Sequence, residues 1–303
     1  MLAEVLAALR PFSGGRYVDG TIGGAGHAAA ILSASSPNGW LFGCDRDGTA
    51  VEAAGRRLAG FEGRFELRRG NYTQLPTWVP AASCDGILLD LGVSSPQLDV
   101  AERGFSFQQD GPLDMRMDTR QALTAAELLN TADAERLAKI FWELGGERDS
   151  RRLARGLVRA REGRPFGTTL QLAEAVERLA PRRGKKTHPA TKIFQALRLA
   201  VNDELGSLEM GLARLCDLLR PGGRLAVLTF HSVEDRLVKD FGRTRTRDYT
   251  FPGKVDVPEL RRPCAPELKW MSRKALQPGA IELLENPRSR SAQLRVLEKN
   301  FMA

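Results

Sequence analysis

Cysteine and histidine are scarce in this chain of 303 residues, and neither is clustered. Zinc sites need closely spaced ligands such as a C-x-x-C pair, and disulfide frameworks need a dense, even set of cysteines. The sequence has neither pattern, so we expect no metal site, no disulfide framework and a reducing, cytoplasmic environment. The scattered residues are Cys44, Cys84, Cys216, Cys264, His27, His188 and His231.

Long apolar runs are also missing. No stretch approaches the ~20 residues that a membrane-spanning helix needs. The opening Met-Leu-Ala-Glu lacks the basic start and the apolar segment of a signal peptide. We therefore expect a cytoplasmic protein without a membrane partner. Hydrophobic residues make up 42% of the chain, enough for a proper core. At roughly 100–200 residues per domain, the length predicts two domains.

Positive charge is concentrated in one segment. The formal net charge is +8, and residues 147–200 contain 14 Lys and Arg against 5 Asp and Glu. This segment is therefore 14 − 5 = +9, which leaves 8 − 9 = −1 for the rest of the chain. A local positive field is what a polyphosphate partner requires, because neutralised phosphates release counterions. A solvated, arginine-rich helical surface is the alternative that charge alone leaves open.

Short apolar runs alternate with helical stretches towards both ends of the chain. Strands separated by helices predict βαβ units and a parallel sheet with both faces covered. The expected strands are residues 16–18, 40–44, 64–69, 87–91, 224–230 and, as an edge strand, 292–298. The expected helices are residues 27–33, 48–58, 207–219 and 233–241, with a turn at Pro221-Gly222-Gly223 and a polar, basic loop at 242–266.

The middle of the chain has no convincing strand between residues 103 and 203. Thr124-x-x-Glu127 and Thr168-x-x-Gln171 have the pattern of capping boxes, and Asp133 is placed to cap a helix at 134–144. Further helices are expected at 148–161 and 190–205. We therefore predict a core, residues 1–102 and 206–303, that is interrupted by a helical domain, residues 103–205.

A glycine-rich turn joins the first expected strand to the first helix, between Asp19 and His27. Its glycines allow a sharp turn and let a ligand approach the main chain, and the helix start offers unpaired N–H groups to an anion. Asp45 ends the second strand, 19 residues after Gly26, where an acid accepts hydrogen bonds from ribose hydroxyls. Together these features predict an adenosine-binding site.

Two cofactors fit this pattern. Residues 24–29 match the dinucleotide motif G-x-G-x-x-G/A, and Arg46 can face a 2′-phosphate, as in an NADP-dependent oxidoreductase. Against this, Gly24 lies six residues past Val18, whereas the dinucleotide turn begins directly after its strand. Asp19 is instead placed to hold the amino acid end of S-adenosylmethionine. A third interpretation is a basic RNA-binding protein that has retained the fold of such an enzyme but is not catalytic.

Asp90 lies in the fourth expected strand and is followed by Gly92-Val93-Ser94-Ser95-Pro96-Gln97. Ligands of open α/β sheets bind beyond the carboxyl ends of the strands. We therefore expect Asp19, Asp45, Asp90 and Ser95 to converge there. A single aspartate at a strand end is often a helix cap, but three at successive strand ends favour a binding site.

Longer runs, spread over nearly the whole chain, are more specific than the glycine turn. They read VDGT from residue 18, GGAGH from 23, DGILLDLGVSSPQLD from 85, ERGFSF from 102, DGPLDMRMD from 110, HPAT from 188, PGGRL from 221, FHSVEDR from 230 and NPRSRS from 286. In these runs the chain resembles the RsmH/MraW family of bacterial 16S rRNA cytosine-N4 methyltransferases. Members usually carry a His-x-Pro-Val stretch before Met-Leu-x-Glu, which here would precede Met1.

The resemblance implies a class I (Rossmann-like) S-adenosylmethionine-dependent methyltransferase with a mostly parallel sheet, whose inserted helical domain helps to recognise RNA. It implies methylation of the N4 amine of a cytidine in the decoding region of 16S rRNA, within the small ribosomal subunit, by a monomer or homodimer. Alanine stands at position 25 where the family would have glycine, which a backbone contact tolerates if φ stays negative. By position, the cofactor contacts fall on Ala25, Gly26, His27, Asp45, Tyr72, Asp90 and Gln97, and the strand-end argument adds Asp19.

The reaction places a particular demand on the site. A methyl group on a sulfonium is electrophilic, whereas the cytosine amine is a poor nucleophile because its lone pair delocalises into the ring. Alignment of amine, methyl and sulfur is therefore the main task, worth ~7–11 kcal/mol. Ser94-Ser95-Pro96 resembles the serine–proline element of DNA amino-methyltransferases, and we expect Asp90 and Ser95 to face the amine as catalytic residues.

Four further side chains have two readings each. His231 borders the target-base pocket or is a strand-end histidine bonded to the backbone. Tyr72 packs on the adenine ring or belongs to the core. Phe105 and Phe107 stack on a flipped base, an interaction worth ~1–3 kcal/mol, or they pack inside the protein.

RNA binding is expected from a basic helix and a basic loop. Residues 148–159 place five arginines at three- and four-residue spacing, which makes one stripe on a helix. Phosphate contacts of this kind position the RNA but do not specify the base. The expected residues are Arg148, Arg151, Arg152, Arg155 and Arg159 of the helix, and Arg182, Arg183, Lys185 and Lys186 of the loop, with Arg288 and Arg290 as candidates in the core domain.

Overall fold

The structure is a computed structural model that describes residues 1–182, 187–253 and 255–301. It divides into two compact units: the first comprises Met1–Gly92 and the chain from Leu205 onward, and the second is Val93–Glu204. Their apolar cores are separate, with one cluster confined to the second unit and two to the first. The helical unit begins at Val93 rather than at residue 103, because Val93 and Leu98 pack against its core.

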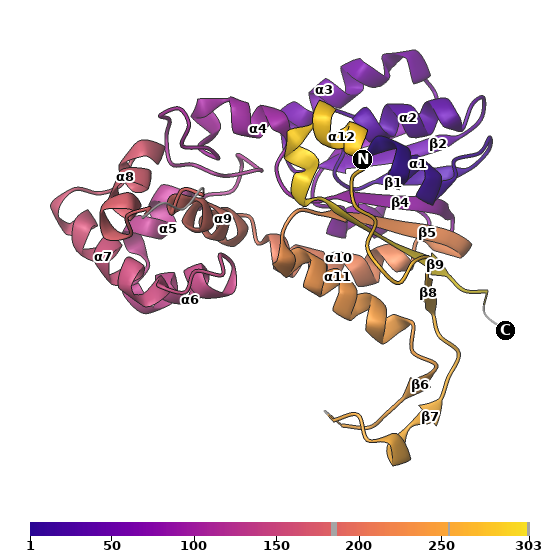
Figure 1. The fold of residues 1–303 in the computed structure, drawn as a ribbon. Coiled ribbons are helices and arrows are strands. Elements are labelled where there is room, and N and C mark those ends of the chain that lie inside the picture. The colour runs from indigo at the N-terminus through magenta and orange to yellow at the C-terminus, as the bar shows by residue number, and fades with distance from the viewer. Residues whose placement is uncertain (183–186, 254, 302–303) are drawn as a thin grey trace. The chain divides into compact units, whose positions relative to one another are not determined.

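The first unit is built on a seven-stranded sheet with the order β3-β2-β1-β4-β5-β9-β8 (Figure 1). From β3 to β5 the strands are parallel, and β9 runs antiparallel to both of its neighbours. The mostly parallel sheet is confirmed, but the expectation that the last strand forms the edge is wrong, because β8 pairs outside it. The strands are β1 (Arg16–Asp19), β2 (Trp40–Asp45), β3 (Phe65–Arg69), β4 (Cys84–Asp90), β5 (Leu219–Thr229), β8 (Leu268–Trp270) and β9 (Gln293–Lys299).

Helices cover both faces of this sheet, so its central strands are apolar on both sides. In β4, Ile87 and Leu89 join the cluster that includes α10, whereas Leu88 joins the opposite cluster with α1, α2 and α3. The helices of this unit are α1 (Leu2–Leu9), α2 (Gly26–Ala34), α3 (Gly48–Leu58), α10 (Glu204–Cys216), α11 (Ser232–Arg245) and α12 (Ala280–Glu285). Short 3₁₀ helices are η1 (Ala59–Phe61), η2 (Tyr72–Thr77), η4 (Pro258–Leu260) and η5 (Pro287–Ser291).

The triplet Pro221-Gly222-Gly223 is not the separate turn that we expected. It lies within β5, where the pairing with β4 jumps from Cys84–Leu219 to Gly86–Arg224. The triplet is therefore extra chain accommodated as a bulge, and Gly222 supplies the positive φ of 80° that such an irregularity requires. Pattern reading missed this because pairing with β4 extends the strand past the turn residues.

The second unit consists of helices packed around one core, and its described residues include no strand longer than a bridge. Three expected caps are present: Thr124 accepts from the N–H of Glu127, Asp133 from that of Arg136, and Thr168 from that of Gln171. The helices are α4 (Ser95–Asp99), α5 (Ala125–Thr131), α6 (Ala134–Glu143), α7 (Ser150–Gly163), α8 (Thr169–Leu179) and α9 (Ala190–Val201), with η3 (Ala101–Arg103).

The expected loop at 242–266 is more ordered than its composition suggests. Helix α11 continues to Arg245, and β6 (Tyr249–Thr250) pairs with β7 (Arg262–Pro263) in a separate two-stranded sheet. The side chain of Arg261 lies over the ring of Tyr249, 4.3 Å from its centroid, which stabilises a hairpin that has no buried core. None of the helices in the described chain has the length and apolarity needed to cross a membrane.

Candidate cofactor site and basic surface

Three aspartates end neighbouring parallel strands at one edge of the sheet: Asp19 ends β1, Asp45 ends β2 and Asp90 ends β4. Strand β1 lies between the other two, and Asp19 is in register with Gly43 and Leu88. Asp45 and Asp90 therefore each extend two residues past the level of Asp19, on either side of it. The sheet thus brings together three of the four residues that we expected to converge.

The turn between β1 and α2 is tied to all three strand ends. The N–H of Thr21 donates to Asp19 Oδ1 at 3.1 Å, and that of Gly23 donates to Asp45 Oδ2 at 2.9 Å. The hydroxyl oxygen of Thr21 accepts a hydrogen bond from the N–H of Asp90 at 2.6 Å. Sequence reasoning did not single out Thr21, because the bond that gives it this role joins it to a strand distant in the chain.

Ala25 precedes α2 in a left-handed conformation, with φ 57° and ψ 29°. The condition of a negative φ, under which alanine is expected to be tolerated at this position, is therefore not met. An L-residue pays roughly 1–2 kcal/mol for this conformation. Its side chain is fully buried and its N–H donates to the carbonyl of Ile22 at 2.7 Å, so packing and hydrogen bonding hold the strained turn in place.

Asp19 has an unusual protonation equilibrium. Only 1% of its surface is exposed, and this burial raises its pKa to about 7. The charge of His27 and the Thr21 N–H oppose the increase, whereas the charges of Asp90 and Asp45 add to it. No Lys or Arg among the described residues forms an ion pair with Asp19. An ammonium group brought beside this carboxylate would favour its charged form.

His27 connects the start of α2 with the end of β4. Its Nδ1 lies 3.4 Å from Asp90 Oδ2. Burial lowers the pKa of His27, but the hydrogen bond and charge of Asp90, together with the charge of Asp19, outweigh it and leave the pKa raised. Among the described residues, none bonds to the second carboxylate oxygen of Asp90, whose side chain is 31% exposed. That oxygen is available to accept a hydrogen bond from a ligand.

Asp45 retains acceptor capacity as well. Its Oδ2 and Oδ1 accept from the N–H groups of Gly23 and Asp47, both at 2.9 Å. Burial raises the pKa of Asp45 against the effect of these bonds. Each carboxylate oxygen has a further lone pair for a ribose hydroxyl. Arg46, which the oxidoreductase reading required for a 2′-phosphate, donates instead to the hydroxyl of Ser207 in α10.

Tyr72, the first residue of η2, belongs to the apolar core on the α10 side of the sheet and is 7% exposed. A Cβ added to Gly211 would lie 2.4 Å from the ring of Tyr72, and a Cβ added to Gly20 would lie 3.0 Å from the Cβ of Tyr72. The two glycines therefore make room for this tyrosine. The structure supports the core reading, and contact with an adenine ring stays a prediction.

Ser95 and Gln97 lie in the second unit, in α4. Ser95 is exposed at the first helical position, whereas Gln97 is buried and its side-chain oxygen accepts from the N–H of Ser94 at 3.0 Å. Gln97 thus has a local structural role as part of a capping box. The expected roles of Ser95 at the amine and of Gln97 at the cofactor stay predictions.

His231, Phe105 and Phe107 all have structural roles. His231 caps α11: its Nδ1 accepts from the N–H of Glu234 at 3.4 Å, and its Nε2 lies 3.0 Å from Glu234 Oε1 without hydrogen-bond geometry. Phe105 is buried in the helical core. The ring of Phe107 packs edge-on against that of Phe194, with centroids 4.8 Å apart. Both phenylalanines therefore have the packing role, the second of their two readings.

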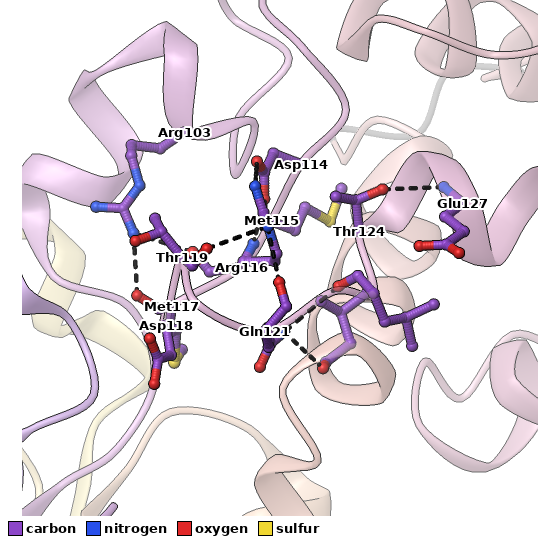
Figure 2. Close-up of polar contacts among 12 residues, drawn as sticks. Arg103, Asp114, Met115, Arg116, Met117, Asp118, Thr119, Gln121, Thr124 and Glu127 are labelled. Atoms are coloured by element: carbon purple, nitrogen blue, oxygen red, sulfur yellow. Dashed lines mark hydrogen bonds and ion pairs between the residues drawn. The ribbon is translucent and has the colours of Figure 1, made fainter. Parts of the chain in front are cut away.

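The run at 110–118 forms a loop locked by its own side chains (Figure 2). The guanidinium of Arg116 donates to both oxygens of Asp114 at 2.8 Å and to the carbonyl groups of Thr119 and Gln121. Arg103 donates to the carbonyl of Arg116 at 3.0 Å. One charged side chain thus bonds to two carbonyl groups and a carboxylate at once, which cross-links this loop within the helical unit.

A buried amide fixes the same loop from the other side. Asn202 is 2% exposed; it donates to the carbonyl of Met115 and accepts from the N–H of Met117, both at 2.8 Å. Met115 is fully buried with φ 61°. The run is visible in the sequence, but the role of Asn202 is not, because this partner is distant in the chain and follows an ordinary helical pattern.

Helix α7 has the two-sided character that the arginine stripe requires. Leu153, Ala154 and Leu157 are buried in the helical core, whereas Arg151, Arg155 and Arg159 are exposed at four-residue spacing. The described residues include no ion-pair partner for these three arginines. The exposed guanidinium groups are therefore available for phosphates, and contact with RNA stays a prediction.

The other expected basic residues differ in their surroundings. Arg148 is exposed just before α7. Arg152 pairs with Asp149 at 2.9 Å and donates to the carbonyl of Leu179, and Arg182 pairs with Glu177 at 2.9 Å. Because of these local ion pairs, the two guanidinium groups are less available to bind a phosphate. Arg183, Lys185 and Lys186 lie outside the described residues.

The fold and this site together define a Rossmann-like methyltransferase. A dinucleotide-binding sheet of order 3-2-1-4-5-6 is parallel, whereas here antiparallel β9 stands between β5 and β8. The carboxylates of Asp45 and Asp90, which have acceptor capacity, and an open turn, where a Cβ added to Gly24 would meet no atom within 4 Å, fit S-adenosylmethionine, the methyl donor of this class. The chain belongs to the MraW methylase family, whose model matches residues 1–300.

Curated relatives match the chain over nearly its whole length. Ribosomal RNA small subunit methyltransferase H of Syntrophotalea carbinolica is 49% identical, with 99% of this chain and 96% of the relative covered. The protein of that name from Geobacter sulfurreducens is 49% identical, covering 99% and 97%. That from Symbiobacterium thermophilum is 46% identical, covering 99% and 95%.

Proposed function

We propose that this protein transfers the methyl group of S-adenosylmethionine to the N4 amine of a cytidine in the decoding region of 16S rRNA, within the small ribosomal subunit and in the cytoplasm. Family membership over residues 1–300 and the names of the relatives support a small-subunit ribosomal RNA substrate. The single observation that carries the chemistry is the edge where Asp19, Asp45 and Asp90 end adjacent strands around the glycine turn.

At this edge of the sheet, Asp45 and Asp19 are proposed to bind different parts of the cofactor. Asp45 accepts from the ribose hydroxyls through its remaining lone pairs, and the buried carboxylate of Asp19 favours the ammonium group of the amino acid end. When bound, S-adenosylmethionine supplies an electrophilic methyl group. The proposed cofactor contacts are Asp19, Ala25, Gly26, His27, Asp45, Tyr72, Asp90 and Gln97.

Asp90 is the proposed catalytic acceptor for the cytosine amine. A hydrogen bond from the amine to its free oxygen draws the nitrogen towards tetrahedral geometry and frees the lone pair. His27, held at 3.4 Å from the other oxygen, orients the carboxylate. Ser95, five residues after Asp90 in the sequence, is proposed to contact the same amine. No base is required before methyl transfer, because the methylated ammonium product is a strong acid.

The exposed arginines of α7 are the proposed RNA-binding surface. Neutralised phosphates release counterions, so each such contact makes the affinity fall as salt rises. The contacts position the RNA, and the base is chosen elsewhere. The proposed set is Arg148, Arg151, Arg152, Arg155 and Arg159, together with Arg182, Arg183, Lys185 and Lys186, which come later in the sequence.

The test is methyl transfer itself. The purified chain is incubated with tritiated S-adenosylmethionine and small ribosomal subunits from a strain that lacks the endogenous enzyme. We expect label in 16S rRNA, and mass spectrometry of the digested RNA should locate it on N4 of one cytidine. Label on another base or another atom contradicts the proposal. An absence of label on both whole subunits and naked 16S rRNA also contradicts it.

The role of Asp90 has its own measurement. Removing one oriented polar group from a reacting centre typically lowers turnover ~10²–10³-fold, and we expect Asp90→Asn to lower kcat by about this factor. Calorimetry on the same variant measures affinity for S-adenosylmethionine, which should change less than kcat. Calorimetry with NADPH on the wild type addresses the oxidoreductase reading, and tight NADPH binding without S-adenosylmethionine binding would overturn the assignment.

A further inference from the structure

A cavity of about 380 Å³ lies at the carboxyl end of β5. Its lining includes His231 and Arg290, which the sequence suggested for the target-base pocket and for RNA binding. Three segments of the first unit line it: the junction of β5 and α11, the stretch that leads into α12, and η5 with the start of β9. The runs FHSVEDR and NPRSRS both contribute lining residues. Two motifs that are far apart in the chain therefore meet at one hollow.

Three of the polar side chains that line this cavity have no partner among the described residues. The guanidinium of Arg290 and the amides of Gln277 and Gln293 form neither hydrogen bonds nor ion pairs with the residues that the structure describes. A cation that has no local carboxylate favours an anionic ligand group. Side-chain amides can donate and accept at the same time, which suits the edge of a nucleobase.

The remaining walls are apolar. Phe230 and Leu283 both line the cavity, and the first of these offers an aromatic ring. A Cβ added to Gly92 would lie 3.6 Å from that ring. Because Gly92 is two residues beyond Asp90, the cavity adjoins the end of β4 where the amine is proposed to react. Small-molecule sites of ~300–1,000 Å³ combine apolar walls with a few polar groups in this way.

The lining is held by bonds that leave its ligand-facing groups unused. The hydroxyl of Ser289, which is 3% exposed, donates to the carbonyl of Asn286 at 2.7 Å, and the N–H of Ala292 donates to the carbonyl of Ser289 at 2.8 Å. These bonds fix the turn that carries Arg290. Glu234 accepts from the N–H of Phe230 at 3.0 Å and fixes the other wall. A site on fixed elements needs little reordering to bind.

We propose that this cavity binds one unpaired nucleotide of the substrate RNA. Arg290 contacts its phosphate, Phe230 packs on the face of its base, and Gln277 and Gln293 bond to the edge of that base. The inference rests on the proposed function, because it takes RNA as the substrate. It adds a nucleotide subsite in the methyltransferase core, distinct from the arginines of α7, and the nucleotide is either the target cytidine or its neighbour.

The first test removes the phosphate contact. We expect Arg290→Ala to raise KM for small-subunit RNA about tenfold, as loss of a hydrogen bond to a charged group does. The slope of log K against log salt should fall by about 0.7, and affinity for S-adenosylmethionine should not change. Arg273→Ala is the matched control, because Arg273 is exposed in the same unit and does not line the cavity. Equal behaviour of the two variants would overturn the proposal.

The second test removes the base-edge contacts and needs no charged group. Gln277→Ala combined with Gln293→Ala should lower kcat/KM for the RNA about tenfold or more, since the bonds lost are those that hold the base. Thermal unfolding and S-adenosylmethionine affinity should match the wild type, because both side chains make no bond within the described chain. Unchanged kcat/KM in this variant and in Arg290→Ala would contradict a nucleotide site.

The third test identifies the nucleotide. A photo-crosslinking amino acid placed at Leu283, which lines the cavity, should join to the RNA at one position. Crosslinking at the target cytidine assigns the cavity to the reacting base, and crosslinking at an adjacent nucleotide assigns it to a flanking one. Scattered crosslinks, or none, would count against the proposal. Methyl transfer by the wild type, measured in parallel, distinguishes this inference from the proposed function. Failure of wild-type transfer would contradict the proposed function. Normal wild-type transfer, with cavity variants that behave like the wild type, would contradict only this inference.

Discussion

The buried carboxylate of Asp19 lowers the stability of the folded protein at neutral pH, and the same carboxylate is proposed to bind the cofactor. Its pKa is about 7 in the folded protein and near 3.9 in an unfolded chain. Between these values the folded state binds more protons than the unfolded state. The contribution of this group to stability is therefore full below about pH 4 and is lost as pH rises through 7.

We expect Asp19→Asn to remove this dependence. Relative to wild type, the free energy of unfolding of the variant should rise by on the order of 2–3 kcal/mol between pH 5 and pH 8. Urea unfolding of the cofactor-free protein at the two pH values measures the difference. Affinity for S-adenosylmethionine at pH 8 should fall, because the variant cannot pair with an ammonium group. A stability difference that does not change with pH would show that the Asp19 carboxyl is not the group responsible.

Ala25 gives a second prediction at this scale. Its φ of 57° is strained for alanine. Ala25→Gly relieves roughly 1–2 kcal/mol of this strain but removes a buried methyl group worth about 0.8 kcal/mol and adds freedom to the unfolded chain. We therefore expect its stability to stay within about 0.5 kcal/mol of the wild type. Ala29→Gly is the control, because it lies inside α2 with ordinary helical geometry and should cost about 0.5–1 kcal/mol. Thermal unfolding compares the two, and equal destabilisation would contradict the strain argument.

Some helix bounds and helix caps can be predicted from local sequence patterns alone. The helix at 48–58 has the predicted bounds, and the caps at Thr124, Asp133 and Thr168 are those that the sequence predicts. Capping chemistry acts within one turn of helix, so a local reading captures it. The bulge in β5 and the inner position of β9 were not predicted, because both depend on which strands pair.

The proposed RNA binding by the exposed arginines of α7 leads to a further prediction. Reversing two exposed arginines, Arg151→Glu with Arg155→Glu, should weaken binding to small-subunit RNA and lower the salt slope by about 1–2, since each phosphate contact contributes ~0.7–0.9. Arg10→Glu with Arg56→Glu changes the net charge by the same amount on the other unit and is the control. Loss of S-adenosylmethionine binding in the stripe variant would indicate misfolding rather than a lost RNA contact.

The whole molecule consists of two units whose cores share no residue. All members of the helical cluster lie between Val93 and Val201, and the two clusters of the sheet lie outside that range. An inserted segment with its own core is expected to fold independently, because few of its buried contacts depend on the host.

We therefore expect residues 93–204, produced alone, to unfold cooperatively with a helical far-UV circular dichroism spectrum. The isolated unit should retain RNA binding through α7 but should not bind S-adenosylmethionine. A matched version with Phe141→Ala, which removes a fully buried ring, should lose cooperativity or several kcal/mol, about 3–5. A molten isolated unit with a normal full-length protein would show that the helical segment needs the sheet.

The sequence by itself determined the alternation that builds a parallel sheet, the helical interruption, and the acids at the strand ends, because these depend on residue type and short spacing. Only the tertiary structure decided that Thr21 and His27 both contact Asp90. It also decided that Asp19 is buried enough to hold its proton near neutral pH, and that two motifs distant in the chain line one cavity. Each of these depends on distance and desolvation between residues far apart in the chain, which no local pattern encodes.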